Sequence, residues 1–454
     1  MSANPINLSS LLSAFGSSQP INVQAAVSQA LAADEAPELQ WQDQQQTIQT
    51  ETTALNSIES DVTALESTLT DLGDPVGALA SMTTSSSNSS IVTATAVNGA
   101  TAANHVVEVN NLATTASWYS AEVASGTTAL ADGTFTIQVG TGTPTVITVG
   151  NGNNTLADLA NTINGMNLGV TANVVTDASG ARLSIVSNTS GAASNIAITA
   201  DSTIGFTQAA AGADASLTVD GIPIDSASNT VTGAVNGVTF NLAGASPGTP
   251  VDIVVSPDVN SASTAISNFV SAFNQVVGDV NTQYTIGANN MEGPVAGDPT
   301  VRLLQSDLLA AGGYTTGSSA VATLADLGIT MNNDGTLSLN TSTLNSAIQN
   351  NFSAVQNFLQ GTSSNGFVSL LSNQLTALTD PTNGAFTVDL QSLSNENTDL
   401  QDQINNFQPY IQQQQTYLTN EFNQADIALE QLPTEEAQIN AELGYQPNSS
   451  TTIL

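Results

Sequence analysis

The chain has 454 residues, 40% of them hydrophobic, so it is long enough and apolar enough for several domains with buried cores. Its 38 Asp and Glu residues face only Arg182 and Arg302, and the formal net charge of −36 excludes nucleic acid and anionic membranes as partners, because both require clustered Lys and Arg. The absence of Lys and Cys excludes Walker-type phosphate loops, Schiff-base lysines, thiol nucleophiles and disulfides, and no apolar run is long enough to span a membrane.

The N-terminal segment predicts two helices between about residues 22 and 72. A short first helix carries Val27 and Leu31 and is expected to end before Pro37, which breaks the pattern. The longer second helix should end at Gly73. Its apolar residues form two lines three and four residues apart, as in the seam of a coiled coil: Trp41, Ile48, Leu55, Val62 and Leu69, and then Ile58, Leu65 and Leu72.

Residues 81 to 258 predict β-structure, because apolar and polar residues alternate in short runs such as the one that contains Phe135, Ile137 and Val139. One helix interrupts the strands, with Thr155 as its N-cap and Leu156, Leu159 and Ile163 on its buried face. Gly tolerates positive φ, so tight hairpins are expected at Asp132-Gly133, Asp220-Gly221 and Asn236-Gly237.

The helical period returns from residue 259, with one helix up to Tyr284 and another from Leu344 to Leu359. Between them, Asn333-Asp334-Gly335 predicts a hairpin. The last helix is expected over about 388 to 442, and Pro409 should kink or split it. Its apolar lines are Leu393, Leu400 and Phe407, and Ile404, Ile411 and Leu418.

Both terminal stripes need a covering partner, since burying one Leu or Ile contributes roughly 1.5 to 3 kcal/mol. The simplest arrangement folds the C-terminal helix back along the N-terminal one, giving a rod of about 30 residues, or roughly 45 Å. The predicted fold class is therefore α+β multidomain, with terminal helices forming a coiled-coil or helical-bundle leg and inserted β-rich head domains. The expected parts are a partly flexible leg (1–40 and 385–454), a helical bundle (41–78 and 259–384), a first β-rich head (79–114 and 213–258) and a second head inserted in the first (115–212).

Two interpretations of the stripes stay open at this point. They are either an oligomer or filament interface that a neighbouring molecule completes, or faces of an ordinary intramolecular bundle. Of the 38 acidic residues, 21 lie in 34–74 and 380–442, where there is no cation, so copies should repel and associate better at low pH or high salt. The residues expected at the interface are Trp41, Ile48, Leu55, Val62, Leu69, Leu400, Ile404, Phe407, Ile411 and Leu418.

No catalytic, cofactor-binding or metal-binding residue is predicted. His105 is the only His and cannot form a zinc site without further ligands, so a structural role is expected. Arg182 and Arg302 should each pair with a carboxylate or cap carbonyl groups, with an intersubunit contact as the alternative. The turn at Asp334 resembles a calcium loop but lacks its closing Glu, which favours a plain turn. Two carboxylates could serve glycoside hydrolysis, yet the chain has only two Trp for sugar stacking, so an enzyme is not expected.

Several stretches resemble, in the same order, those of one known family. They are PINVQAAVSQALAADEAPELQWQDQQ at 20–45, SMTTSSSNSSIVTATA at 81–96, ANHVVEVNNLATTAS at 103–117, the run at 155–191, the stretch at 215–258 that contains VDGIPI, and 324–348. The chain is thus similar to the flagellar hook-associated protein 2 family, the filament cap. One departure is that the family's terminal helices usually carry Lys and Arg, whereas here they carry none.

The resemblance implies a homo-oligomeric ring at the distal tip of the bacterial flagellum, required for filament elongation and motility. Legs built from the terminal helices would contact the filament, and the heads would hold exported flagellin while it folds and polymerises. Implied partners are further copies of the chain, flagellin, the hook-filament junction proteins and an export chaperone at the C-terminal helix, without nucleic acid, membrane insertion or a cofactor. No basic region precedes an apolar segment, so export without a cleaved signal peptide is expected. The alternative is a secreted surface adhesin whose heads bind host or surface glycans.

Overall fold

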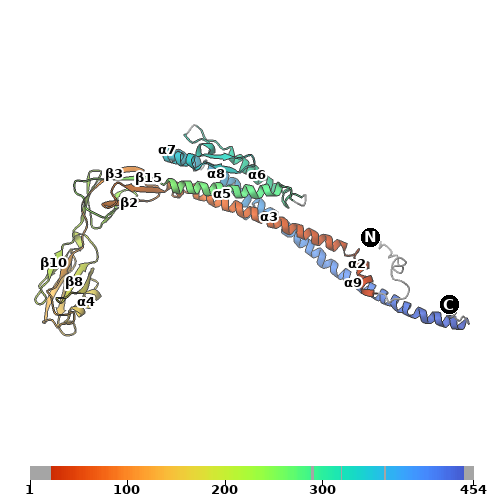
Figure 1. Ribbon diagram of the computed structural model, residues 1–454, viewed down its shortest axis with the longest axis horizontal. Coiled ribbons are helices and arrows are strands. Elements are labelled where there is room, and N and C mark those ends of the chain that lie inside the picture. The colour runs from red at the N-terminus through yellow and green to blue at the C-terminus, as the bar shows by residue number, and fades with distance from the viewer. Residues whose placement is uncertain (1–21, 288–290, 318–319, 362–364, 444–454) are drawn as a thin grey trace, which may run out of the picture.

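The protein is a long helical rod that carries two β-rich heads at one end (Figure 1). The computed structural model describes residues 22–287, 291–317, 320–361 and 365–443. Helix α2 and the end of α9 lie at the opposite end of the rod from the heads. The predicted α+β class, with terminal helices and inserted β-rich domains, is confirmed. The outer parts of the predicted leg, 1–21 and 444–454, lie outside the described residues.

The rod is built around three terminal helices, α2 (Val23–Leu31), α3 (Ala36–Gly73) and α9 (Ala385–Glu442). Pro37 lies in the first turn of α3, where its missing N–H costs no helical hydrogen bond, so the predicted break is confirmed, as is the end at Gly73. Helix α9 continues without interruption through Pro409, so of the two predicted outcomes, a kink or a split, the split is wrong. Pro409 has no N–H to donate to the carbonyl of Asn405, one turn earlier. Both residues are exposed, so water can bind that carbonyl instead.

A helical bundle lies alongside α3 in the middle of the rod (Figure 1). Its core joins apolar residues of α3 to Phe269, Phe273, Phe358 and Phe367, all at most 1% exposed. The predicted α5 and α7 and the hairpin at Gly335 (φ 83°) are confirmed, whereas α6 and α8 were not individually predicted. The elements are η1 (Ala78–Ala80), α5 (Val259–Tyr284), α6 (Pro299–Gly312), η3 (Leu324–Leu327), β16 (Ile329–Met331), β17 (Leu337–Leu339), α7 (Thr341–Leu359) and α8 (Phe367–Thr379).

The first head packs an antiparallel five-stranded sheet, β1-β15-β3-β11-β12, and a three-stranded sheet, β13-β14-β2, around one core. Asp220 and Gly221, with φ of 54° and 79°, join β11 to β12, and Gly237 (φ 75°) lies between β13 and β14, so both predicted hairpins are confirmed. The strands are β1 (Met82–Ser86), β2 (Val92–Ala96), β3 (Ala103–Asn111), β11 (Ala215–Val219), β12 (Ile222–Ser226), β13 (Thr230–Val235), β14 (Val238–Leu242) and β15 (Val251–Pro257).

The second head has its own core between the sheets β10-β4-β8-β7 and β6-β5-β9, with α4 packed on β7. Thr155 caps α4 as predicted, accepting a hydrogen bond from the N–H of Asp158. The predicted hairpin at Asp132-Gly133 is wrong, because Gly133 is the first residue of β5. A Cβ on Gly133 would lie 2.0 Å from Cγ2 of Thr203. The elements are β4 (Ser117–Tyr119), β5 (Gly133–Val139), β6 (Thr145–Val149), α4 (Leu156–Gly165), β7 (Val170–Thr176), β8 (Ala181–Ser187), η2 (Ala192–Ser194), β9 (Ile196–Thr199) and β10 (Thr207–Ala210).

Candidate assembly interface

The far end of the rod is formed by α2, the start of α3 (residues 36–48) and α9 from residue 397 onward, which we call the leg. The helices are antiparallel: Gln45 of α3 lies beside Gln401 of α9, while Trp41, one turn earlier, lies beside Phe407. The C-terminal helix therefore folds back along the N-terminal one, as the sequence predicts.

The structure divides the ten predicted interface residues between two environments. Leu55, Val62 and Leu69 belong to the bundle core, at most 1% exposed, where α3 packs against α5 and α8. These three side chains have no surface left for a neighbouring molecule, so the intramolecular interpretation holds for them. The other seven lie in the leg, with Ile48, Leu400, Ile404 and Leu418 buried and Trp41, Phe407 and Ile411 half-buried.

An aromatic cluster reaches the surface of the leg. The rings of Trp41 and Phe407 meet edge to face with their centroids 5.3 Å apart, and Tyr410 lies 5.4 Å from Phe407. Tyr410 is 45% exposed and Tyr417, two turns later, is 58% exposed. Aromatic residues that are partly buried and partly wet are enriched at protein interfaces, so this cluster is a surface suited to a further contact.

Uncharged side chains join the leg helices, since neither helix has a cation. The Gln45 amide donates to the carbonyl of Asn397 and to the Gln401 amide oxygen, both at 3.3 Å. The Gln408 amide donates to a carboxylate oxygen of Glu38 at 3.4 Å. The ion pairs that usually flank a coiled-coil seam are thus replaced by amide hydrogen bonds.

The apolar contact in the leg ends before α9 does. Ala26, Val27 and Leu31 of α2 form a small buried cluster with Leu418 and Phe422. Beyond Phe422 no described residue of α9 is buried. Four large apolar side chains in and directly after this part of α9 are exposed instead, and none of them was among the predicted interface residues. They are Ile427, Leu432, Ile439 and Leu443, exposed by 55%, 53%, 54% and 75%.

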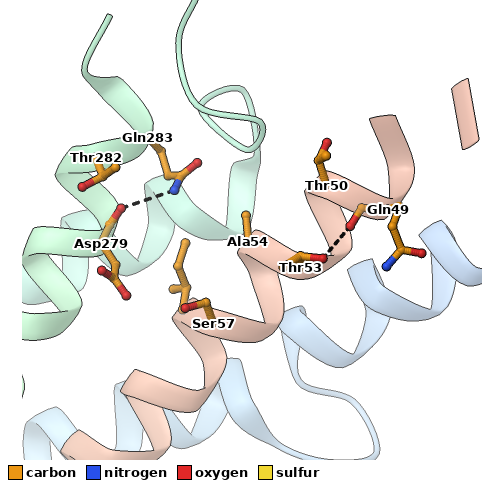
Figure 2. A pocket seen from close by; sticks show the side chains of 9 residues that line it. Gln49, Thr50, Thr53, Ala54, Ser57, Asp279, Thr282 and Gln283 are labelled. Atoms are coloured by element: carbon orange, nitrogen blue, oxygen red, sulfur yellow. Dashed lines mark hydrogen bonds between the residues drawn. The ribbon is translucent and has the colours of Figure 1, made fainter. Parts of the chain in front are cut away.

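A pocket lies between α3 and α5 (Figure 2). Its lining is mainly neutral: Gln49, Thr50 and Thr53 come from α3, and Thr282 and Gln283 come from α5. The hydroxyl of Thr53 donates to the carbonyl of Gln49 at 2.7 Å, so it is not held as a nucleophile by a base.

One carboxyl group in this pocket is strongly perturbed. A hydrogen bond with Asp61 of α3, followed by burial, raises the pKa of Asp279 to about 6. A neighbouring pocket is lined by Glu51, Asp298 and Asp389, and burial is the first cause that raises the pKa of Glu51 and of Asp298. Within the part of the chain that the structure describes, no group of three or more His, Asp or Glu side chains is placed to hold a metal ion.

Both cations have local partners, as predicted. The guanidinium of Arg182 pairs with Glu122 at 2.8 Å and also donates to the carbonyl of Ser120. That of Arg302 donates to the carbonyl of Gly297 at 2.9 Å.

The only His and the calcium-like turn are also structural. Nδ1 of His105 lies 2.8 Å from Oδ2 of Asp220, and this hydrogen bond holds the pKa of Asp220 below its usual value. The carboxylate of Asp334 accepts from the N–H and the hydroxyl of Thr336, which makes it part of a plain turn. No helix in the described ranges is both long and apolar enough to cross a membrane.

Comparison with known proteins gives consistent matches along most of the chain. The family profiles "Flagellar hook-associated protein 2 N-terminus" and "Flagellar hook-associated protein 2 C-terminus" match residues 19–116 and 212–434, and "Flagellin hook IN motif" matches 134–189. The B-type flagellar hook-associated protein 2 of Pseudomonas aeruginosa is 31% identical over 74% of this chain and 77% of its own length. The Escherichia coli K12 flagellar hook-associated protein 2 is 25% identical over 96% and 99%.

A solved structure extends the likeness to the fold. The D1-D2-D3 domains of the flagellar cap protein FliD from Escherichia coli match with a TM-score of 0.59 and 26% identity. The match covers 75% of this chain and 99% of that one.

Proposed function

The chain belongs to the flagellar hook-associated protein 2 family, and we propose that it is the cap at the distal tip of a bacterial flagellar filament. The observation that carries the proposal is the match to the Escherichia coli cap structure, which includes nearly all of that chain. The family is one of structural proteins. The comparisons give no support to the adhesin alternative.

The cap would act as a homo-oligomeric ring that promotes the folding and polymerisation of exported flagellin. The shape supports this assignment of roles, because the heads and the leg lie at opposite ends of a rod (Figure 1). The leg would reach the filament and the hook-filament junction proteins, and the heads would face incoming subunits. A chaperone would cover the C-terminal helix inside the cell before export.

We place the contact with neighbouring molecules on the part of the leg that a single chain leaves uncovered. It comprises the half-buried Trp41, Phe407 and Ile411 and the exposed apolar residues of α9 beyond Phe422. Exposed apolar side chains gathered on one segment mark interaction sites in soluble proteins. The four predicted leg residues that are buried would then support this surface from within.

Deletion and complementation test the function and the surface separately. Cells that lack the gene should release unpolymerised flagellin into the medium and carry no filaments, and the wild-type gene should restore filaments. Complementation with Ile427→Gln, Leu432→Gln and Ile439→Gln combined should fail, although the purified variant keeps its helical content. The matched control changes Gln424, Gln431 and Gln438 of the same segment to Ala, and it should restore filaments.

The outcomes distinguish the two claims. Normal filaments in the deletion strain would refute the cap function. Full restoration by the triple Gln variant would leave the cap function standing and refute the assignment of the contact to this part of α9.

A further inference from the structure

The two heads are joined by two chain crossings, because the second head is inserted in the first. The crossings are residues 112–116 and 211–214. Thr114 and Ala213 exchange two backbone hydrogen bonds across them, at 2.9 and 3.2 Å, and this single antiparallel bridge pairs the crossings into what we call the ribbon. A two-stranded ribbon is marginally stable by itself, and relative motion of domains is the default for such a link.

A loop of the second head adds a third connection. This loop, residues 189–192, reaches past the ribbon to the first head. The Ser190 hydroxyl donates to the carbonyl of Ala227 at 2.7 Å, and the N–H of Ala192 donates to the carboxylate of Asp214 at 2.7 Å. The N–H of Gly191 donates to the carbonyl of Thr114 in the ribbon at 3.1 Å. The loop thus contacts both the first head and the ribbon.

The contact is close enough that only Gly fits at its centre. Gly191 has a φ of 104°, and a Cβ there would lie 2.9 Å from Cβ and 3.0 Å from Cα of Ala227. A Cβ on Gly212 would lie 2.7 Å from the carbonyl oxygen of Gly191. Glycine permits both the backbone conformation and this approach of one backbone to another.

Each crossing is also clamped by an amide side chain of one head. Asn229 of the first head accepts from the N–H of Ala113 at 2.7 Å and donates to its carbonyl at 2.9 Å. Asn195 of the second head accepts from the N–H of Gly212 at 3.1 Å. The ribbon is therefore held at both of its ends, and the loop restrains the bending that the ribbon alone would permit.

We propose that the docking of loop 189–192 on the first head locks the two heads into one rigid body at a fixed angle, with Gly191 as the residue that permits the contact. The heads then move as a unit. This inference does not depend on the cap function, since it concerns only the joint.

Double electron–electron resonance, which measures the distance distribution between two spin labels, tests the joint on the full chain. The chain has no Cys, so spin labels attach only at the cysteines that are introduced. Val97→Cys in the first head and Val146→Cys in the second provide exposed positions, 61% and 59%. We expect one narrow distance distribution in this labelled parent, and Gly191→Val should broaden it about twofold or more, as when a packed contact becomes a hinge.

The matched control is Gly152→Val in the second head. Gly152 also has positive φ, 81°, but a Cβ there meets nothing within 4 Å, so this variant strains the backbone without touching the joint. It should keep the parent distribution. Asp214→Ala removes one hydrogen bond of the loop without a clash, and it should broaden the distribution less than Gly191→Val does.

A broad distribution in the labelled parent would overturn the proposal. So would narrow distributions in both joint variants. Altered Trp118 fluorescence would show that Gly191→Val unfolds the second head. In that case the distance distribution of Asp214→Ala decides whether the loop locks the heads, because this variant leaves the backbone conformation intact.

Discussion

Replacing Asp279 by Asn should make the protein more stable at neutral pH and leave it nearly unchanged in acid. Asp61 and Asp279 share a hydrogen bond between α3 and α5, and two carboxyl groups can do so only when one carries a proton. The pKa of Asp279, raised from 3.8 to about 6, is higher in the folded protein than in the unfolded chain. The shared proton therefore stabilises the fold fully below pH 3.8, and this contribution is lost as the pH rises through about 6.

The expected size follows from the pKa difference. About two pKa units correspond to about 3 kcal/mol. Both groups are partly exposed, so solvent screening reduces this to about 1 kcal/mol. An Asn at position 279 donates its amide N–H to the Asp61 carboxylate without needing a proton. The variant should therefore unfold with a free energy about 1 kcal/mol above that of the parent at neutral pH.

Urea unfolding followed by circular dichroism at about pH 4.5 and about pH 7.5 measures the difference. Asp71→Asn, an exposed position on the same helix α3, controls for the removal of one negative charge. The reasoning fails if Asp279→Asn is less stable than the parent at neutral pH, or if the difference between the two proteins is the same at both pH values.

Two further perturbations address the leg. Pro409→Ala restores a helical hydrogen bond in the exposed middle of α9, so it should raise the free energy of unfolding of the leg by up to about 3 kcal/mol. Thermal melting measures the effect, and an unchanged or lower melting temperature would contradict this prediction. Self-association of the intact protein should strengthen as the pH falls from about 8 to about 4 or as salt is raised, because the acidic segments of neighbouring copies then repel less. Analytical ultracentrifugation that shows the same association state throughout would rule out this repulsion.

Local rules were sufficient wherever one residue decides the backbone. The N-cap Thr155, the end of α3 at Gly73 and the hairpin at Asp220-Gly221 all follow from the residue at the position itself. Asp132-Gly133 carries the same local signal, yet Gly133 begins a strand that pairs with β6, and the side chain of Thr203 lies close to it. Nothing in the sequence near residue 133 reports a neighbour seventy residues away.

The interface residues show the same limit at a larger scale. A single seven-residue stride runs through Trp41, Ile48, Leu55 and Val62, so the sequence treats them alike. Trp41 contacts Phe407 of α9, whereas Leu55 and Val62 lie in the core of the bundle with α5. Hydrophobic periodicity identifies the face of a helix that is buried, but the covering element is decided by the topology of the whole chain.

The scarcity of cations separates folding from assembly in this protein. Inside the chain, carboxylates accept hydrogen bonds from neutral donors: Glu66 of α3 accepts from the hydroxyls of Thr376 and Thr379 of α8, both at 2.9 Å. The side-chain amide of Gln360, the C-cap residue of α7, donates to the backbone carbonyl of Leu72 at 2.9 Å, which is also a contact between neutral groups. Salt weakens interactions between exposed charges, and these bonds need no opposite charge, so the fold of one chain should depend little on ionic strength. Contacts between copies, by contrast, would have to overcome the repulsion of uncompensated acidic helices, so we expect salt to act mainly on assembly.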